Sequence, residues 1–189
     1  MKKLITQLFS SAQNNIGSMY ANGQGVSQDD VKAVKWYRLA ADQGYAEAQY
    51  NLGVMYNNGQ GVPQDYAQAM KWTRLAADQG LEFAQLHLAR MYDHGLGVPK
   101  DDAQAMKWLH LAADQGNAYA QYNLGNHYHH TRTKEYVQAY KWFSLAAAQG
   151  FVGNYFANAA RQKDVVAKQM TPQQITEAEE LARNWKPKK

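Results

Sequence analysis

The chain has 189 residues, 46% of them hydrophobic, which is enough for one domain with a continuous core. It has no cysteine, and this excludes disulfides, thiolate metal sites and thiol nucleophiles. The formal net charge of +4 is modest, and no basic stripe with interleaved aromatic residues follows any predicted helix, so we expect no nucleic-acid binding.

The first residues resemble the start of an export signal. Two lysines precede a short apolar stretch, Leu4, Ile5, Leu8 and Phe9. Two polar residues interrupt that stretch, which is already shorter than the ~7–15 apolar residues of a signal-peptide core. Cleavage after Ala12 would also cut into the first predicted helix. We therefore expect an uncleaved N-terminus and a cytoplasmic protein, with periplasmic or secreted locations left open. No segment reaches the ~18 apolar residues of a membrane span.

Four copies of one sequence pattern make up most of the chain. Trp36, Trp72 and Trp108 are 36 residues apart, and Trp142 follows 34 residues later. Self-similarity at this period is typical of a solenoid built from pairs of helices. Because each tryptophan shares a helix face with alanines, the pattern predicts that Trp72 and Trp108 are core residues.

The second copy shows why each repeat should form two helices. Its first half has apolar residues at every fourth position, which is one face of a helix. Gly59 and Gly61 then end this helix, because glycine adopts positive φ without a steric penalty. Asp65 is a favourable N-cap for the second helix, and Gly80 ends that helix. The fourth copy lacks two residues and the paired glycines between its helices, so we expect a tighter or more irregular loop at 129–134.

The recurring pattern resembles a known repeat family. It reads A-Q-x-x-L-G-x-M-Y, then G-x-G-V-x-x-D, then A-x-x-W-x-x-x-A-A-x-Q-G, in four copies from about Ser10 to Gly150. This pattern is similar to the SEL-one-like repeat, a relative of the tetratricopeptide repeat. The resemblance implies a right-handed α-solenoid whose first helices line a concave face. It also implies adaptor or scaffold roles, which are common in bacterial signalling, envelope and host-interaction proteins. Two features depart from the pattern: Ala89 replaces a first-helix glycine, and the loop from His129 to Lys134 lacks G-x-G.

The expected architecture is all-α, a single solenoid domain of stacked helix–turn–helix repeats over 1–189. After Gly150 the repeat pattern stops, and Thr171, Pro172 and Gln174 mark the start of a last helix. The following residues include several acidic ones, which suits a terminal helix because the end of a solenoid must present a polar outer face. The predicted segments are the repeats 10–44, 45–80, 81–116 and 117–150 and a C-terminal cap at 151–189.

One stripe of the first helix varies between copies while the packing residues stay the same. Its members recur at spacings of three and four, so they share a helix face. Positions that packing leaves free can be varied to suit a partner, and neutral drift of exposed positions is the alternative interpretation. The predicted protein-binding residues of the concave face are Tyr50, Asn51, Val54, Asn58, His87, Arg90, His94, Tyr122, Asn123, Asn126 and His130.

Histidines concentrate in the last two copies of this stripe. His94 and His130 occupy the same position in adjacent copies, and His127 and His129 flank the second of them. Convergence on a metal ion is one interpretation, but no carboxylate–histidine spacing accompanies them, and a structural site usually needs about four ligands. We expect no metal and no cofactor. Instead we expect a polar surface whose imidazoles gain charge and bind an acidic partner better below about pH 6.5.

The sequence offers no catalytic constellation. No serine lies in G-x-S-x-G, and no S-x-x-K motif occurs. The G-x-G loops have no preceding strand and no following G-K-[ST], so they are not phosphate-binding loops. The expected function is therefore that of a non-catalytic protein-interaction scaffold or adaptor. One alternative is a dedicated inhibitor or immunity-type protein that neutralises one partner enzyme, and a less favoured one is a hydrolase acting on cell-wall or β-lactam-like substrates.

The partner is expected to be another protein, whose identity the sequence leaves open. The apolar residues Leu4, Ile5, Leu8 and Phe9 lie where a preceding repeat would stack. Because uncapped solenoid ends associate, the sequence also predicts self-association through the N-terminal end.

Overall fold

The computed structural model describes residues 2–131, 135–149 and 154–188, with side chains described except at 2–6 and 154–156. Within these ranges the chain forms ten α-helices and no strand, which confirms the predicted all-α class. The helices form two compact units, Met1–Ala105 and Met106–Lys189. The expectation of a single domain depends on how these units combine, and it stays a prediction.

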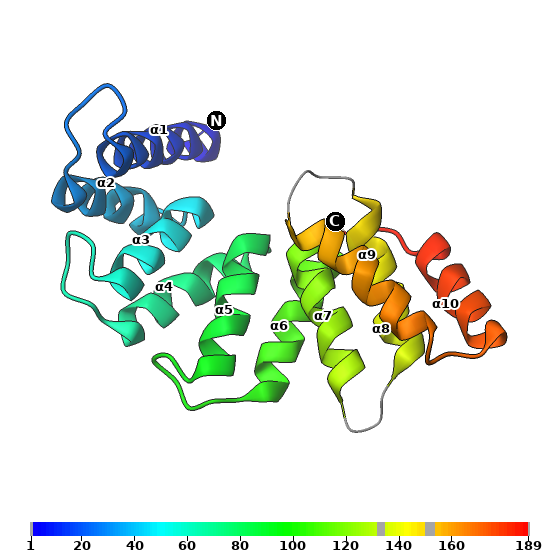
Figure 1. Cartoon of the computed structure of the whole chain (residues 1–189). Helices are drawn as coiled ribbons and strands as arrows, with labels where there is room; N and C mark the ends of the chain where they lie inside the picture. The colour runs from blue at the N-terminus through cyan, green and yellow to red at the C-terminus, as the bar shows by residue number, and fades with distance from the viewer. Residues whose placement is uncertain (1, 132–134, 150–153, 189) are drawn as a thin grey trace. The chain divides into compact units, whose positions relative to one another are not determined.

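Unit one is a row of helices in which each helix packs against the next one in the chain (Figure 1). Contacts join α1 to α2, α2 to α3, α3 to α4 and α4 to α5, so helix pairs stack one after another as the repeat pattern predicts. The bounds are α1 Lys2–Asn22, α2 Asp30–Asp42, α3 Ala46–Asn58, α4 Tyr66–Asp78 and α5 Glu82–His94.

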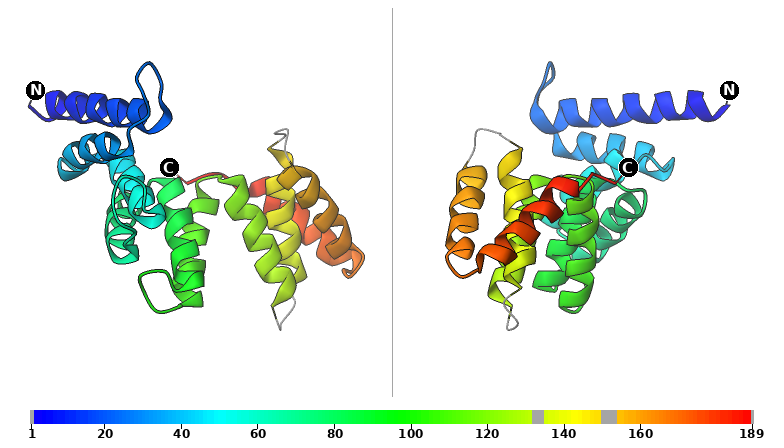
Figure 2. Two further views of the ribbon diagram at one scale, coloured as in Figure 1. Left: turned by 60° about the vertical axis from the view of Figure 1, so that its left-hand side comes forward. Right: turned by 90° about the vertical axis from the view of Figure 1, so that its right-hand side faces the viewer.

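Unit two is centred on one helix, α8. Contacts join α8 to α7 on one side and to α9 and α10 of the predicted cap, and α7 also contacts α9 (Figure 2). The helix α6, Asp102–Asp114, crosses the boundary between the two units. The other bounds are α7 Ala118–His130, α8 Tyr136–Ala148, α9 Asn154–Ala167 and α10 Pro172–Asn184.

Local capping explains where the second helix of a repeat begins. The Asp65 carboxylate accepts hydrogen bonds from the backbone N–H groups of Ala67 and Gln68, at 2.9 and 3.0 Å. These groups lie in the first turn of α4 and have no partner within the helix, so the aspartate satisfies them. Asp29 does the same for Lys32 in α2, and the cap predicted at Asp65 is confirmed. An aspartate at this position therefore marks the start of the helix without any tertiary contact, because its carboxylate bonds only to residues two or three positions ahead.

The loop of the fourth repeat closes at the same point as the other loops despite its deletion. In the third repeat the N–H of Asp101 donates to the carbonyl of Tyr92, nine residues earlier, at 3.0 Å. In the fourth, the N–H of Glu135 donates to the carbonyl of Tyr128, seven residues earlier, at 3.2 Å. The predicted irregularity falls mainly on residues 132–134, which lie outside the described residues, so it stays a prediction.

The two helices of a repeat approach closely where the first helix has glycine. A Cβ at Gly17 would lie 2.6 Å from the Tyr37 ring, and a Cβ at Gly125 would lie 2.6 Å from the Phe143 ring. Both distances are far below van der Waals contact. Glycine in these first helices therefore makes room for a side chain of the second helix.

The repeat tryptophans are not equally buried. Trp108 and Trp142 are 4% and 3% exposed, which confirms the core prediction for Trp108. Trp72 packs against the core of unit one but is only partly buried, so it lies at the edge of the core rather than inside it as predicted. Lys71 places its Nζ 5.2 Å from the Trp72 ring centroid, and Lys107 and Lys141 make the same contact with Trp108 and Trp142.

Thr73 is a fully buried residue whose hydroxyl oxygen has no hydrogen-bond partner among the described residues. A buried, unsatisfied polar group costs about 1–3 kcal/mol, and valine has nearly the same shape without the hydroxyl. We therefore expect Thr73→Val to raise the free energy of unfolding by about 1 kcal/mol, measured by urea denaturation. Thr73→Ser, which keeps the hydroxyl and loses the methyl group, should instead destabilise. A loss with valine would show that the hydroxyl has a partner.

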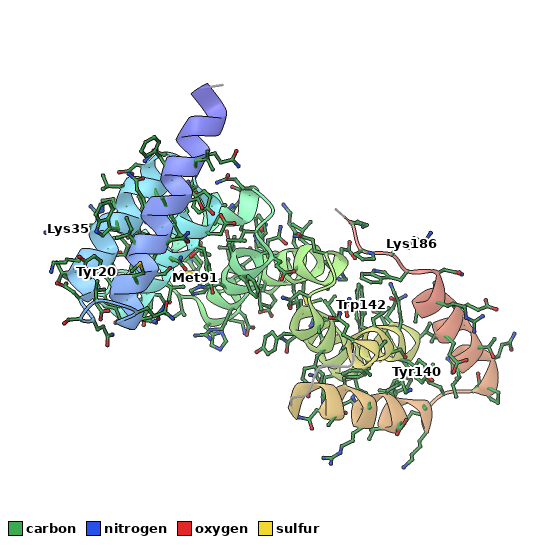
Figure 3. All side chains as sticks on the ribbon, turned by 90° about the horizontal axis from the view of Figure 1, so that it is seen from above. Tyr20, Lys35, Met91, Tyr140, Trp142 and Lys186 are labelled. Carbon is green, nitrogen blue, oxygen red and sulfur yellow. The ribbon has the colours of Figure 1, made fainter. Side chains whose placement is uncertain are left out.

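The cap predicted at the C-terminus is present. Thr171 and Gln174 form a reciprocal capping box at the start of α10, with Pro172 at the first helical position. Ala178 of α10 is buried. The hydroxyl of Tyr140 of α8, a residue labelled in Figure 3, bonds to the Glu179 carboxylate at 3.2 Å. The predicted outer face is exposed at Glu177, Glu179, Glu180 and Arg183.

The chain after α10 returns to the end of α6. The Lys188 ammonium pairs with the Asp114 carboxylate at 2.6 Å, and the Lys188 N–H donates to the Asp114 carbonyl at 2.7 Å. Trp185 and Pro187 lie next to Gly116, so the tail covers the α6–α7 turn of unit two.

The N-terminal helix exposes apolar side chains. Leu8 and Phe9 are 65% and 64% exposed, whereas the side chains of Leu4 and Ile5 lie outside the described residues. Self-association through this end stays a prediction. In the part of the chain that the structure describes, no helix combines the length and apolar character needed to cross a membrane.

Candidate protein-binding surface

The predicted stripe in unit one lies on α3 and α5 and is only partly used for packing. Asn58 of α3 and Arg90 and His94 of α5 are exposed. Leu88 and Met91, which lie close to Arg90 along α5 but on its other face, are buried. The remaining stripe members of unit one, Tyr50, Asn51, Val54 and His87, are half-buried. These side chains are the part of the first helices that the core does not use.

Successive first helices touch through pairs of residues that are 37 positions apart. The Asn51 side-chain amide of α3 donates to the Asn14 side-chain oxygen of α1 at 3.0 Å. The next pair is Tyr50 of α3 and His87 of α5, whose ring centroids lie 5.9 Å apart in an edge-on arrangement at 82°. The structure therefore brings Tyr50 and His87 together, whereas Asn51 is committed to a contact between repeats.

Two other stripe residues are bonded to their own turn of helix or loop. Asn58 donates to the Gln60 side chain at 3.0 Å and accepts from Asn57 at 2.8 Å. His94 places Nδ1 3.0 Å from the Arg90 carbonyl oxygen. A carbonyl can only accept, so Nδ1 of His94 carries the proton and its Nε2 remains an acceptor when the ring is neutral.

Arg90 differs from its neighbours because its guanidinium is uncommitted. Among the described residues its side chain has no ion pair and no hydrogen bond. By contrast, Arg74 in the preceding second helix bonds to the Tyr92 hydroxyl at 3.0 Å and pairs with Asp78 at 3.4 Å. Arg90 is thus an exposed cation beside the Tyr50–His87 pair. We call Tyr50, His87 and Arg90 the Arg90 cluster.

The electrostatics of the Arg90 cluster correct one expectation. Burial lowers the pKa of His87 from 6.5 to about 4, and the nearby Arg90 charge acts in the same direction. Burial also raises the pKa of Tyr50, against the opposing effect of Arg90. His87 is therefore neutral at pH 5–7, and the expectation that its imidazole gains charge below about pH 6.5 is wrong for this residue.

In unit two the stripe lies on α7 and is more closely tied to the fold. Tyr122 packs on the Phe143 ring with centroids 5.8 Å apart, so much of its surface belongs to the core of unit two rather than to a free face. His130 places Nδ1 2.8 Å from the Asn126 carbonyl oxygen, the same arrangement as His94. Asn123 and Asn126 are half-buried and His130 is exposed.

The histidines of α7 do not converge on a common point. The His129 ring lies beside the His130 ring at 4.8 Å, while the His127 ring is edge-on to Tyr128 at 5.7 Å. Among the described residues, no group of three His, Cys, Asp or Glu side chains is placed to hold a metal ion. The absence of a metal in the working protein stays a prediction.

Sequence reasoning missed a set of buried glutamines that join successive repeats. Gln49, Gln85 and Gln121 each donate a side-chain N–H to the alanine carbonyl eight residues earlier, at 3.2–3.3 Å. Gln79 and Gln149, at the ends of second helices, donate to the side chains of Gln49 and Gln121. The A-Q pair that recurs in every copy could have indicated these contacts, but the sequence analysis assigned the glutamine no role.

A second recurring contact joins each second helix to the next first helix. The guanidinium of Arg38 bonds to the Tyr56 hydroxyl, and Arg74 bonds to Tyr92 in the same way. In unit two, the His110 ring takes the place of the arginine, with Nε2 3.0 Å from the Tyr128 hydroxyl oxygen. The recurring tyrosines therefore serve stacking between repeats.

Stacked helix pairs with one repeated set of contacts between pairs define the protein as an α-solenoid. The model of the Sel1 repeat matches residues 10–45, 46–81, 83–117 and 118–151, so the chain belongs to the Sel1-repeat family. These matches confirm that the chain has four repeats, and their starts differ from the predicted ones by two residues at most, at 81 and 83 in the third copy. Repeats of this family mediate protein interactions, and their fold is typically non-catalytic.

Several bacterial structures are similar to this chain. A Sel1 repeat protein from Oxalobacter formigenes is 28% identical, with a TM-score of 0.71 and with 87% of this chain and 75% of that chain covered. The protective antigen c5321 from uropathogenic Escherichia coli, which displays an SLR fold, is 28% identical with a TM-score of 0.59. That alignment covers 93% of this chain but only 45% of the longer antigen.

A more distant likeness is to the immunity protein Pa5087 from Pseudomonas aeruginosa. It is 23% identical with a TM-score of 0.55, and 92% of this chain and 67% of that chain are covered. At this identity the likeness concerns the fold. The sequence matches no curated protein.

Proposed function

We propose that the chain is a non-catalytic protein-binding module whose contact surface is the first-helix face of α3 and α5. The observation that carries this proposal is Arg90, an exposed cation without a partner in the described chain, next to the half-buried rings of Tyr50 and His87. Arginine and tyrosine are enriched at interface hot spots, which are desolvated once the complex has formed. The stripe on α7 in unit two is a second candidate contact region.

The fold supports such a surface because it is pre-formed. The stripe residues lie on helices that are held by the glutamine and tyrosine contacts between repeats, not on loops. A partner that binds a rigid helix face loses little ordering entropy on this side of the interface. The same rigidity suits a scaffold and a dedicated inhibitor, and no observation favours the inhibitor, since the likeness to Pa5087 supports the fold alone.

The test compares variants of the stripe with a variant of the same residue type elsewhere. A partner is first recovered by pull-down and mass spectrometry, and its affinity is then measured by calorimetric titration. We expect Arg90→Ala and His94→Ala to keep the helical circular dichroism signal and to weaken binding, with a loss of about 2 kcal/mol or more at Arg90.

Arg183→Ala is the matched control, because Arg183 is exposed on the outer face of α10. It is a better control than Lys71→Ala, since Lys71 contacts the Trp72 ring. Binding that is unchanged in both stripe variants, or equally weakened in the control, would move the contact surface away from α3 and α5.

A further inference from the structure

We propose that the Arg90 cluster is a carboxylate subsite that receives an aspartate or glutamate side chain from an extended segment of the partner protein. This inference rests on the proposed function and adds the chemistry of the partner. It starts from the edge-on Tyr50–His87 ring pair and from Arg90, which is exposed three residues after His87 on α5 and whose charge acts on both rings.

The three side chains of the Arg90 cluster offer hydrogen-bond donors to which no described residue is bonded. The Arg90 guanidinium, the His87 imidazole and the Tyr50 hydroxyl have no hydrogen-bond partner among the described residues. Guanidinium only donates, a neutral imidazole has one N–H, and a phenol has one O–H. A carboxylate only accepts, through two oxygens, so it fits this set better than an amide or an ammonium group does.

The charge on this face of unit one also selects an acidic ligand. Beside Tyr50, the stripe on α3 and α5 consists of Asn51, Val54, Asn58, His87, Arg90 and His94, none of which is a carboxylate; the acidic residue on the same side of α3 is the exposed Glu47, one helical turn before Asn51. The nearest acidic residue along α5 is Asp93, which is already shared between Lys100 at 3.9 Å and His94 at 3.4 Å. Arg90 therefore lacks a counter-charge of its own and can receive one from a partner.

The surroundings of Arg90 make such a pair stronger than an ordinary surface ion pair. His87 and Tyr50 are both half-buried, and their rings pack edge-on with centroids 5.9 Å apart. Both rings respond to the Arg90 charge, which acts to lower the pKa of each of them. A carboxylate bound here loses contact with water on the ring side, and charge-assisted hydrogen bonds are stronger in such a partly desolvated site.

The probes are two blocked peptides that differ in one side-chain group. Both are extended, uncharged at the ends and rich in serine and glycine, and one has a central glutamate where the other has glutamine. Binding is followed by NMR on the full chain, from the Arg90 Nε–H and the His87 ring C–H signals. We expect saturable shifts of both signals with the glutamate peptide and none with the glutamine peptide.

Two variants complete the test. Arg90→Gln is expected to weaken the glutamate peptide about tenfold or more, since a hydrogen bond to a charged group contributes about 1.5–3 kcal/mol. Tyr50→Phe, which keeps the ring and removes the hydroxyl, should weaken it less, and the control Arg183→Gln should leave it unchanged. Equal shifts with both peptides, or shifts that survive Arg90→Gln, would overturn the carboxylate subsite.

A third peptide separates a side-chain carboxylate from a terminal one. It carries no acidic residue but has a free C-terminal carboxylate, and preferential binding of this peptide would contradict the side-chain assignment. The inference and the proposed function can fail separately. If Arg90→Ala weakens the recovered partner but no glutamate peptide binds, only the subsite is wrong, whereas a partner insensitive to Arg90 and His94 removes the surface itself.

Discussion

Replacing Trp108 with alanine is expected to lower the free energy of unfolding by about 3–5 kcal/mol. The Trp108 side chain is 4% exposed, so its removal leaves a cavity that a close-packed interior fills only in part. The cost has two parts: the free energy gained by burying the indole away from water is lost, and so are the packing contacts around it. Urea denaturation followed by circular dichroism measures the change, with the slope of the transition checked for two-state behaviour.

Trp72→Ala is the matched comparison, because Trp72 occupies the same position one repeat earlier but remains partly exposed. We expect a smaller loss, about 1–3 kcal/mol, since part of the indole already contacts water. The difference between the two variants tests burial itself, with the residue type held constant. Equal losses, or an unchanged midpoint for Trp108→Ala, would show that the two rings do not differ in packing as the structure indicates.

Features set by local chemistry were predictable from the sequence. Asp29 and Asp65 cap the helices that follow them through hydrogen bonds to residues two or three positions ahead. Such contacts depend only on neighbouring residues, so their signal is complete in a short stretch of sequence. The period of the repeat likewise predicted that helix pairs stack, because each copy must bury its apolar stripe against the next copy.

The composition of the Arg90 cluster was only half predictable. Comparison of the copies places Asn51 and His87 at equivalent positions, 36 residues apart, and it puts all of these residues on one face. In the structure the contacts run one residue further, so Tyr50 meets His87 and Asn14 meets Asn51. This offset follows from how adjacent helices lie against each other, which a single repeat does not contain. In this arrangement the side-chain amide of Asn51 is used in a hydrogen bond between repeats, whereas the Arg90 guanidinium has no hydrogen bond among the described residues.

The shift in the His87 pKa was also beyond the sequence. An imidazole in a polar stripe is expected to titrate near 6.5, and burial against Tyr50 and proximity to Arg90 bring the pKa to about 4. Both causes are contacts between helices. The buried glutamines are a different case, since Gln49 recurs visibly in the pattern, but its bond to the Ala41 carbonyl of the preceding repeat becomes evident only once the helices are stacked.

Gly61 shows the same difference between a local and a tertiary role, and it leads to the second large expected effect. The sequence explains this residue by positive φ, and its φ is +67°. In the structure a Cβ at this position would overlap the backbone carbonyl of Asp30 at the start of α2. Gly97 stands in the same relation to the Tyr66 carbonyl one repeat later. In repeats two and three, the second glycine of the loop therefore lets the loop touch the second helix of the preceding repeat.

Gly61→Ala should accordingly lower the free energy of unfolding by about 2–5 kcal/mol, the sum of left-handed strain and a displaced backbone contact. Gly80→Ala is the control, because Gly80 has φ +90° and a Cβ added there would meet no atom within 4 Å, so only the strain of about 1–2 kcal/mol applies. Both are measured by urea denaturation. Equal losses would mean that Gly61 is kept for its backbone conformation alone. A larger loss at Gly61 would show that close approach between the loop and α2 stabilises the stacking that holds α3 and its stripe in place.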